Sequence, residues 1–296
     1  MLCAQFASGD VTDMNATVRT AAREALEKFK DKGLTELQLA VTVMDLSDPS
    51  RPPAGSFRGD VPIYPASVVK LFYLAAAHRW MEDGKLPDSD ELRGEMRKMI
   101  VDSSNQSTGY VIDAITGTTS GDELPEDELK VWAGKRNAIN KYFASLGYEK
   151  INVNQKTWEQ SPYGRDKQFL GGAKFTNRNA LTTDATARLM SEIVTGKCVS
   201  TERSRQMMEL LQRDMSDAKK KDGQATDFTG RALTPQDKLW SKAGWTSTTR
   251  HDVAYVETTD GLKFVIAIFT VDHANQREII PTIVRSVMSQ MRKAKE

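Results

Sequence analysis

The segment Ser67-Val68-Val69-Lys70 places a hydroxyl and an amine three positions apart, shortly after Pro65. Residues three apart on a helix share a face, so the amine of Lys70 would lie beside the hydroxyl of Ser67. A buried lysine near another cation loses its proton readily, and the neutral amine can then take the proton of an attacking serine. The start of a helix adds backbone N–H groups and a favourable dipole for a developing oxyanion. This spacing indicates acyl transfer by a serine nucleophile, with an ordinary helix N-cap as the alternative interpretation of Ser67.

The sequence lacks the residue patterns of several other kinds of enzyme. There is no G-x-S-x-G, no phosphate-binding loop and no dinucleotide fingerprint. The three histidines, His78, His251 and His273, do not have metal-ligand spacing. We therefore expect no metal and no cofactor, and we expect a lysine or a carboxylate as the base. We interpret His78 as a packed residue and His251 as a candidate to face a cleft.

A second serine–lysine pair of the same spacing, Ser216 and Lys219, runs into the charged segment 219–221. We interpret that segment as a solvated surface because it is a run of charges. Only the first serine–lysine pair stands at the start of an apolar helix.

Two further motifs follow in a fixed order. Ser103-Ser104-Asn105 lies in a polar turn between predicted helices, and Lys242-Ala243-Gly244 lies on a predicted strand near the C-terminus. The order S-x-x-K, S-D-N and K-T-G is the signature of class A β-lactamases and penicillin-binding proteins. This sequence resembles that family fully in the first motif and in two of three positions in each of the others. The similar order of elements covers about residues 15 to 294.

The resemblance implies a role for each matching position. Ser67 would be the acylated nucleophile and Lys70 its base. Ser103 would relay a proton to the leaving nitrogen. The substrate-binding positions implied are Asn105 for the substrate amide, Lys242 and Gly244 for the carboxylate side, and the backbone N–H of Trp245, with that of Ser67, for the oxyanion.

Departures from the family pattern bear on the substrate and on the second half of the reaction. Ala243 replaces a hydroxyl residue that would bind a substrate carboxylate. Thr246, Ser247 or Arg250 could compensate, with a different substrate as the alternative. Ser104 replaces an acid. In class A β-lactamases a loop glutamate activates the deacylating water, and Glu159 is the candidate for that position, with an exposed loop acid as the alternative.

The elements that must position these residues come from both ends of the chain. Helical periodicity predicts helices over 13–32 and 276–293, and alternation predicts a strand over 37–46. Strand-like runs lie over 238–245, 252–258 and 263–271, and Asp260-Gly261 between the last two indicates a hairpin. The middle of the chain is mostly helical, with helices predicted over 90–101 and 127–146 among others, and with a long irregular loop over 154–181. We therefore expect an α/β fold of the α+β type. An antiparallel sheet lobe (13–66 and 234–296) would be flanked by the terminal helices, and an all-helical lobe (67–233) would be inserted into it.

Composition excludes several classes of protein. Among 296 residues, 41 Lys+Arg nearly balance 40 Asp+Glu, so we expect no nucleic-acid partner. The longest apolar runs, 71–77 and 264–268, fall far short of the roughly 20 residues of a membrane helix. We expect a monomer that binds a small-molecule or peptide-like acyl substrate.

The compartment is implied only by the resemblance, as periplasmic or secreted, and no export signal is visible in the sequence. Cys3 and Cys198 are interpreted as ordinary thiols, with a lipid anchor as the alternative for Cys3.

The sequence thus favours a serine hydrolase resembling class A β-lactamases, with β-lactam catabolism and antibiotic resistance as the roles that the family implies. Two alternatives stay open. One is a peptidase or esterase relative with poor β-lactam turnover. The other is a non-catalytic protein that binds cell-wall peptides or a protein partner in the same cleft.

Overall fold

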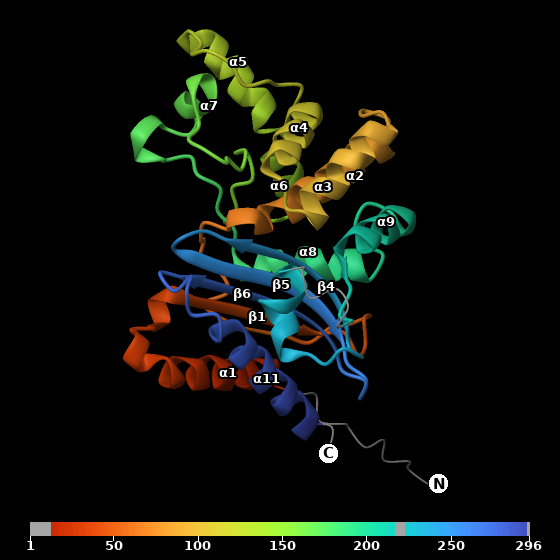
Figure 1. Cartoon of the computed structure of the whole chain (residues 1–296). Helices are drawn as coiled ribbons and strands as arrows, with labels where there is room; N and C mark the ends of the chain where they lie inside the picture. The colour runs from red at the N-terminus through yellow and green to blue at the C-terminus, as the bar shows by residue number, and fades with distance from the viewer. Residues whose placement is uncertain (1–12, 217–222, 295–296) are drawn as a thin grey trace, which may run out of the picture.

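A six-stranded antiparallel sheet forms the centre of the molecule in the computed structural model, which describes residues 13–216 and 223–294 (Figure 1). Cys3 and the segment 219–221, and with it the second serine–lysine pair's Lys219, lie outside the described residues. The strand order is β2-β1-β6-β5-β4-β3, so strands from both ends of the chain pair directly. The strands are β1 (Leu39–Asp45), β2 (Ala54–Phe57), β3 (Gln212–Arg213), β4 (Lys238–Trp245), β5 (Thr249–Glu257) and β6 (Lys263–Val271).

Helices cover both faces of this sheet. The terminal helices α1 (Met14–Lys28) and α11 (Ile279–Lys293) lie together on one face (Figure 1). On the other face α8 (Thr183–Val194) packs against β1, β5 and β6. The remaining helices are α2 (Lys70–Glu82), α3 (Asp90–Val101), α4 (Asn105–Thr116), α5 (Glu126–Arg136), α6 (Ala138–Ser145), α7 (Gly164–Phe169), α9 (Thr201–Leu211) and α10 (Gly223–Thr226). Short 3-10 helices are η1 (Lys30–Lys32), η2 (Glu36–Gln38), η3 (Ala66–Val69), η4 (Gly172–Lys174) and η6 (Thr229–Ala232).

Side chains alternate between two apolar clusters along each central strand, as the period of two requires. Val253 of β5 packs with α2 and α8, whereas its neighbour Ala254 packs with α1 and α11. The same alternation places the side chains of Lys242 and Ala243 on opposite faces of the sheet. Lys242 is the register partner of Val253, whereas Ala243 is buried in the cluster formed with α1 and α11. The sheet therefore presents Lys242 on the face that carries α2.

The antiparallel sheet flanked by the terminal helices is confirmed, with both helices on one face, and the bounds of α3, β4 and β6 agree with the predicted ones. The single helix predicted over 127–146 is wrong, because the chain forms α5 and α6 with a break at Asn137. The side-chain oxygen of Asn137 accepts hydrogen bonds from Asn140 (2.7 Å) and Asn154 (3.1 Å), which hold the junction. The assignment of 67–233 to a separate lobe stays a prediction.

The segment 154–181 is less irregular than its composition suggests, since it contains α7. Side-chain amides order its ends. The Asn179 Oδ1 accepts the N–H groups of Asn154 (3.1 Å) and Gln155 (2.9 Å), and the Asn179 Nδ2 donates to the Gln155 carbonyl (2.9 Å). Such local side-chain bonds replace the backbone ladder that a loop lacks.

No helix of the described residues has the length and apolar character to cross a membrane. Cys198 is a buried free thiol, and burial raises its pKa to about 12. A thiol of that pKa stays protonated and poorly nucleophilic near neutral pH.

Candidate active site

Ser67 lies in η3, and Lys70 opens α2 directly after it. The Ser67 side chain is partly exposed, whereas Lys70 is fully buried. Strand β4 touches this turn at Gly244. A side-chain carbon on Gly244 would lie 2.8 Å from the backbone nitrogens of Ser67 and Val68 and from the carbonyl oxygen of Pro65. Only a residue without a side chain lets β4 approach the turn this closely.

The buried amine of Lys70 is held by the Ser103 motif. Its Nζ donates to the backbone carbonyl of Ser103 (2.5 Å) and to the Asn105 Oδ1 (2.8 Å) and lies 3.3 Å from the Ser103 Oγ. Burial lowers the pKa of Lys70 to about 7, although the Glu159 carboxylate acts in the opposite direction. The hydrogen bonds of the described residues include none from Lys70 to Ser67. The amine is therefore partly neutral at physiological pH and is aligned by two carbonyl-type oxygens.

The hydroxyl of Ser103 bridges two lysines that are far apart in the sequence. Lys242 Nζ lies 3.0 Å from the Ser103 Oγ, and Lys70 Nζ lies 3.3 Å from the same oxygen. Lys242 also donates to the Gln224 Oε1 (2.9 Å) and to the Ala243 carbonyl (2.7 Å). A serine hydroxyl offers one donor and two acceptor positions. It can therefore accept from the Lys242 ammonium while it exchanges a proton with a neutral Lys70.

Gln224 is a site residue that sequence reasoning missed. Its Oε1 accepts from the Lys242 amine and from the Ala243 N–H (3.2 Å). Its Nε2 donates to the carbonyl of Val101 (2.9 Å), which ends α3. A lone glutamine in a polar stretch carries no motif, so only the fold reveals that it ties β4 to α3.

The backbone N–H of Trp245 points away from β5. The Thr246 N–H donates to the Thr249 carbonyl (3.0 Å) toward β5, whereas the Ala243 N–H donates to Gln224 on the other side. Because successive N–H groups alternate in direction along a strand, the Trp245 N–H points to the same side as that of Ala243. β3 pairs only with the first part of β4, so this edge of β4 is open near Trp245.

The side chains of Trp245 and Arg250 lie on the sheet face opposite to Lys242. These two residues are register partners, and both contact Phe228, at 5.7 Å between rings for Trp245 and 4.1 Å for the Arg250 guanidinium. With Thr246 they line a cavity of about 220 Å³. Arg250 Nη2 donates to the Asp227 carbonyl (2.7 Å). The structure thus brings Lys242 and Ser103 together and separates the Arg250 guanidinium from them.

Glu159 is an exposed residue that borders the site. It lines a cavity of about 490 Å³ together with Asn105. The Asn105 Nδ2 donates to the carbonyl of Trp158 (3.3 Å), and so the segment that carries Glu159 is anchored to the Ser103 motif. Lys156, on the same segment, pairs with Asp113 of α4 (2.6 Å). These bonds tie the segment that carries Glu159 to α4, and the Glu159 carboxylate acts electrostatically on Lys70.

His251 is a buried structural residue of β5 and does not face the cleft. Its Nδ1 accepts the N–H of Thr270 (3.0 Å), so its Nε2 is the donor to the carbonyl of Tyr64 (2.9 Å). Burial lowers the pKa of His251 to about 4, which keeps the ring neutral. His78 is likewise buried in α2, as its packed position predicts, and burial lowers its pKa to about 4. Among the described residues no group of histidine, cysteine and carboxylate side chains could hold a metal ion.

Comparisons with known proteins give one consistent result. Residues 21–290 match the model of the β-lactamase enzyme family. No curated protein matches the sequence significantly. Among solved structures, a β-lactamase from Sphaerobacter thermophilus has 19% identity and a TM-score of 0.66, with 93% of this chain and 96% of that chain covered.

Two further structures show the same fold. A class A β-lactamase from Bacteroides cellulosilyticus has 15% identity and a TM-score of 0.65, with 94% and 99% covered. The penicillin-binding protein PBP-A has 15% identity and a TM-score of 0.62, with 91% and 96% covered, and a variant of it is an acyl-enzyme complex with penicillin G. The chain belongs to the β-lactamase enzyme family and is a serine hydrolase of that type.

Proposed function

We propose that this hydrolase is acylated at Ser67 by a β-lactam-like amide and releases the acyl group to water. The observation that carries the proposal is the Ser103 hydroxyl, held between the buried amines of Lys70 and Lys242. The turn that carries Ser67 lies against the same strand as Lys242. This arrangement supports a nucleophile, a neutral base and a proton path within one cluster.

The acylation step follows from these groups. The Ser67 oxygen attacks the carbonyl carbon, and its proton passes to the neutral amine of Lys70. The backbone N–H groups of Ser67 and Trp245 would stabilise the oxyanion. The proton then moves from Lys70 through the Ser103 hydroxyl to the substrate nitrogen as the C–N bond breaks. Lys242 would remain charged and attract an anionic group of the substrate, while Asn105 would hold its amide.

Deacylation requires a base near the acyl bond, and Glu159 is our candidate. Its carboxylate influences Lys70 electrostatically and lines the same cavity as Asn105. One observation favours a second candidate function, a peptidase or esterase relative that releases the acyl group slowly. The hydrogen bonds of the described residues include none to the Glu159 carboxylate, so its position is not fixed by a partner.

We also propose that the chain acts as a periplasmic or secreted monomer. All groups in this mechanism come from one chain, and β-lactam-like substrates are met outside the cytoplasm. Size-exclusion chromatography with light scattering would test the monomer, and fractionation of the native host would test the location.

Acylation is tested by intact mass. We expect a fluorescent penicillin, or p-nitrophenyl acetate as a simple ester, to add one acyl group to the wild-type chain. Ser67→Ala should abolish this adduct, because it removes the hydroxyl of the partly exposed turn that lies against β4. Ser47→Ala, which removes an exposed hydroxyl elsewhere, should acylate normally. An adduct that survives in Ser67→Ala would contradict the assignment of the nucleophile, and no adduct with either probe would favour the non-catalytic alternative.

The role of Glu159 is tested by separating the two half-reactions. In Glu159→Gln we expect acylation to continue within a few-fold of the wild-type rate. Loss of the general base should slow deacylation by about 10²–10⁴-fold. The acyl-enzyme should then accumulate in intact-mass time courses with a chromogenic cephalosporin. Equal deacylation rates in both proteins would exclude Glu159 as the base and support the slow-release alternative.

A further inference from the structure

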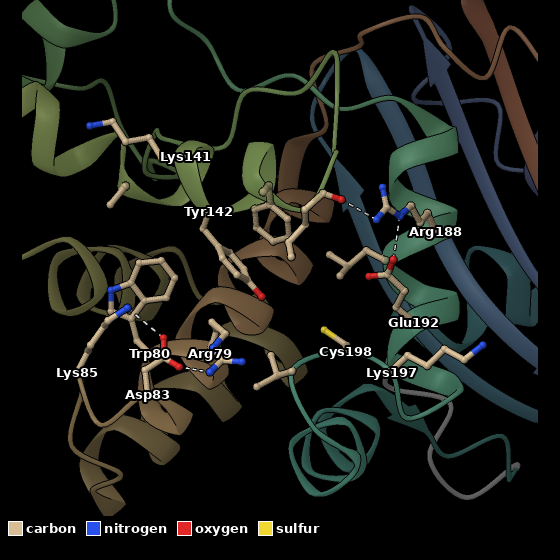
Figure 2. Close-up of a pocket in the computed structure, with 15 residues that line it drawn as sticks. Arg79, Trp80, Asp83, Lys85, Lys141, Tyr142, Arg188, Glu192, Lys197 and Cys198 are labelled. Carbon is tan, nitrogen blue, oxygen red and sulfur yellow. Dashed lines mark hydrogen bonds and ion pairs between the residues drawn. The ribbon is translucent and has the colours of Figure 1, made fainter.

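A further cavity, of about 740 Å³ (Figure 2), shares no lining residue with the cavity that Glu159 borders. It is bordered by the end of α2, by α6 and α8, and by the segment 197–199. Arg79 and Trp80 line it, nine and ten residues along α2 from Lys70, which is about 14 Å of helix. None of the candidate active-site residues borders it.

Aromatic and aliphatic side chains form the walls of this cavity. Tyr142 packs edge-on against Trp80, at 5.4 Å between ring centroids and 89° between planes, and lies 5.0 Å from Phe143. Leu146 and Leu189 add aliphatic surface. Pockets of a few hundred Å³ with such walls and a few directed polar groups are typical of small-molecule sites.

The hydroxyl of Tyr142 supplies a directed polar group. It points into the cavity, toward Cys198 and Arg79 (Figure 2). Burial raises the pKa of Tyr142 to about 12, so the hydroxyl stays protonated and can donate. Within the described part of the chain it makes no hydrogen bond.

The charge of the lining is positive. Five lining residues are cationic and two are anionic, a balance of +3 in a chain whose whole net charge is +1. Asp83 pairs with Arg79 and Lys85, and Glu192 pairs with Arg188. The cations are Arg79, Lys85, Lys141, Arg188 and Lys197. This excess attracts an anion, and the apolar walls favour one with an aromatic or aliphatic body.

We propose that this cavity binds an aryl carboxylate of one or two rings. The rings would pack among Trp80, Tyr142 and Phe143. The carboxylate would accept a hydrogen bond from the Tyr142 hydroxyl and lie next to the guanidinium of Arg79. The proposal is independent of acylation at Ser67, because the two sites share no lining residue.

Binding is tested with 2-naphthoate by isothermal titration calorimetry on the full chain. The neutral analogue 2-naphthylmethanol should bind at least about 10-fold more weakly, since it lacks the charge-assisted contacts. Tyr142→Phe and Arg79→Gln should each weaken 2-naphthoate binding by about 10-fold. Arg205→Gln is the matched control, because Arg205 pairs with Glu209 at the same helical spacing on an exposed surface outside the cavity. The Arg205→Gln protein should bind 2-naphthoate with the affinity of the wild type.

The location of the ligand is tested by filling the cavity. Ala138→Phe should occupy the space between its walls and remove the calorimetric signal. Equal binding of the two ligands, unchanged binding in Tyr142→Phe and Arg79→Gln, or unchanged binding in Ala138→Phe would each overturn the proposal. Because none of these measurements uses acylation, their outcome is distinct from that of the Ser67 experiment.

Discussion

Replacing Lys70 with methionine is expected to slow acylation of Ser67 by roughly 10³-fold, the range of a lost general base. Methionine is an unbranched side chain one atom shorter than lysine, so it suits the same buried space but cannot accept a proton. The amine is already prepared for this task, since burial lowers its pKa to about 7 and two carbonyl-type oxygens orient it. The measurement is the rate of adduct formation with the fluorescent penicillin.

The pH profile separates a base from a residue that only supports the fold. In the wild type the acylation rate should rise with pH and level off above about 7, as Lys70 becomes neutral. In Lys70→Met this rise should disappear. Lys98→Met is the matched control, because Lys98 is an exposed lysine that pairs with Glu95. The Lys98→Met protein should be acylated at the wild-type rate. A rate unchanged in Lys70→Met, or one that keeps the same pH rise, would exclude Lys70 as the base.

The same pKa shift has a consequence for stability. The folded state holds Lys70 with a pKa of about 7, below the ordinary lysine value of 10.5, so between these values the unfolded chain binds more protons. The contribution of Lys70 to the free energy of unfolding therefore increases with pH through this window and is lost as pH falls toward 7. Denaturant unfolding at several pH values should show a shallower pH dependence for Lys70→Met.

The sequence was sufficient to predict the elements whose patterns are local. The strand-like runs of β4 and β6 and the helical period in α3 gave bounds that the structure confirms. The continuous apolar run of β6 reflects burial on both faces of the sheet, whereas α3 is buried on one face. The strands β2 and β3 were not predicted, since four and two residues are too short for a pattern and form only by pairing with β1 and β4.

Only the site residues that belong to recognisable sequence motifs could be predicted. The resemblance grouped Ser103 with Lys70 and Lys242, and the structure brings these three side chains together. Gln224 was missed because its partners come from β4 and α3, which no sequence pattern links. The sheet face that each side chain occupies explains why Arg250 does not join this cluster. Arg250 follows Lys242 closely in sequence, yet strand alternation puts its guanidinium on the opposite face of the sheet.

Gly244→Ala is expected to reduce the acylation rate by about 10²–10³-fold, the effect of losing one oxyanion donor. The added carbon would lie 2.8 Å from three backbone atoms of the Ser67 turn, and backbone atoms cannot move aside as a flexible side chain can. Strand β4 must therefore retreat from η3, which separates the N–H groups of Ser67 and Trp245. The same strain should lower the free energy of unfolding by about 1–3 kcal/mol.

Gly134→Ala provides the matched control for this substitution. Gly134 lies in α5, and an added side-chain carbon there would have no neighbour within 4 Å. Alanine at this exposed helical position should raise the free energy of unfolding by roughly 0.5–1 kcal/mol and leave acylation unchanged. A Gly244→Ala protein that unfolds at lower denaturant but acylates at the wild-type rate would show that close contact between β4 and the turn serves stability alone. In that case the oxyanion donors would have to come from groups other than Ser67 and Trp245.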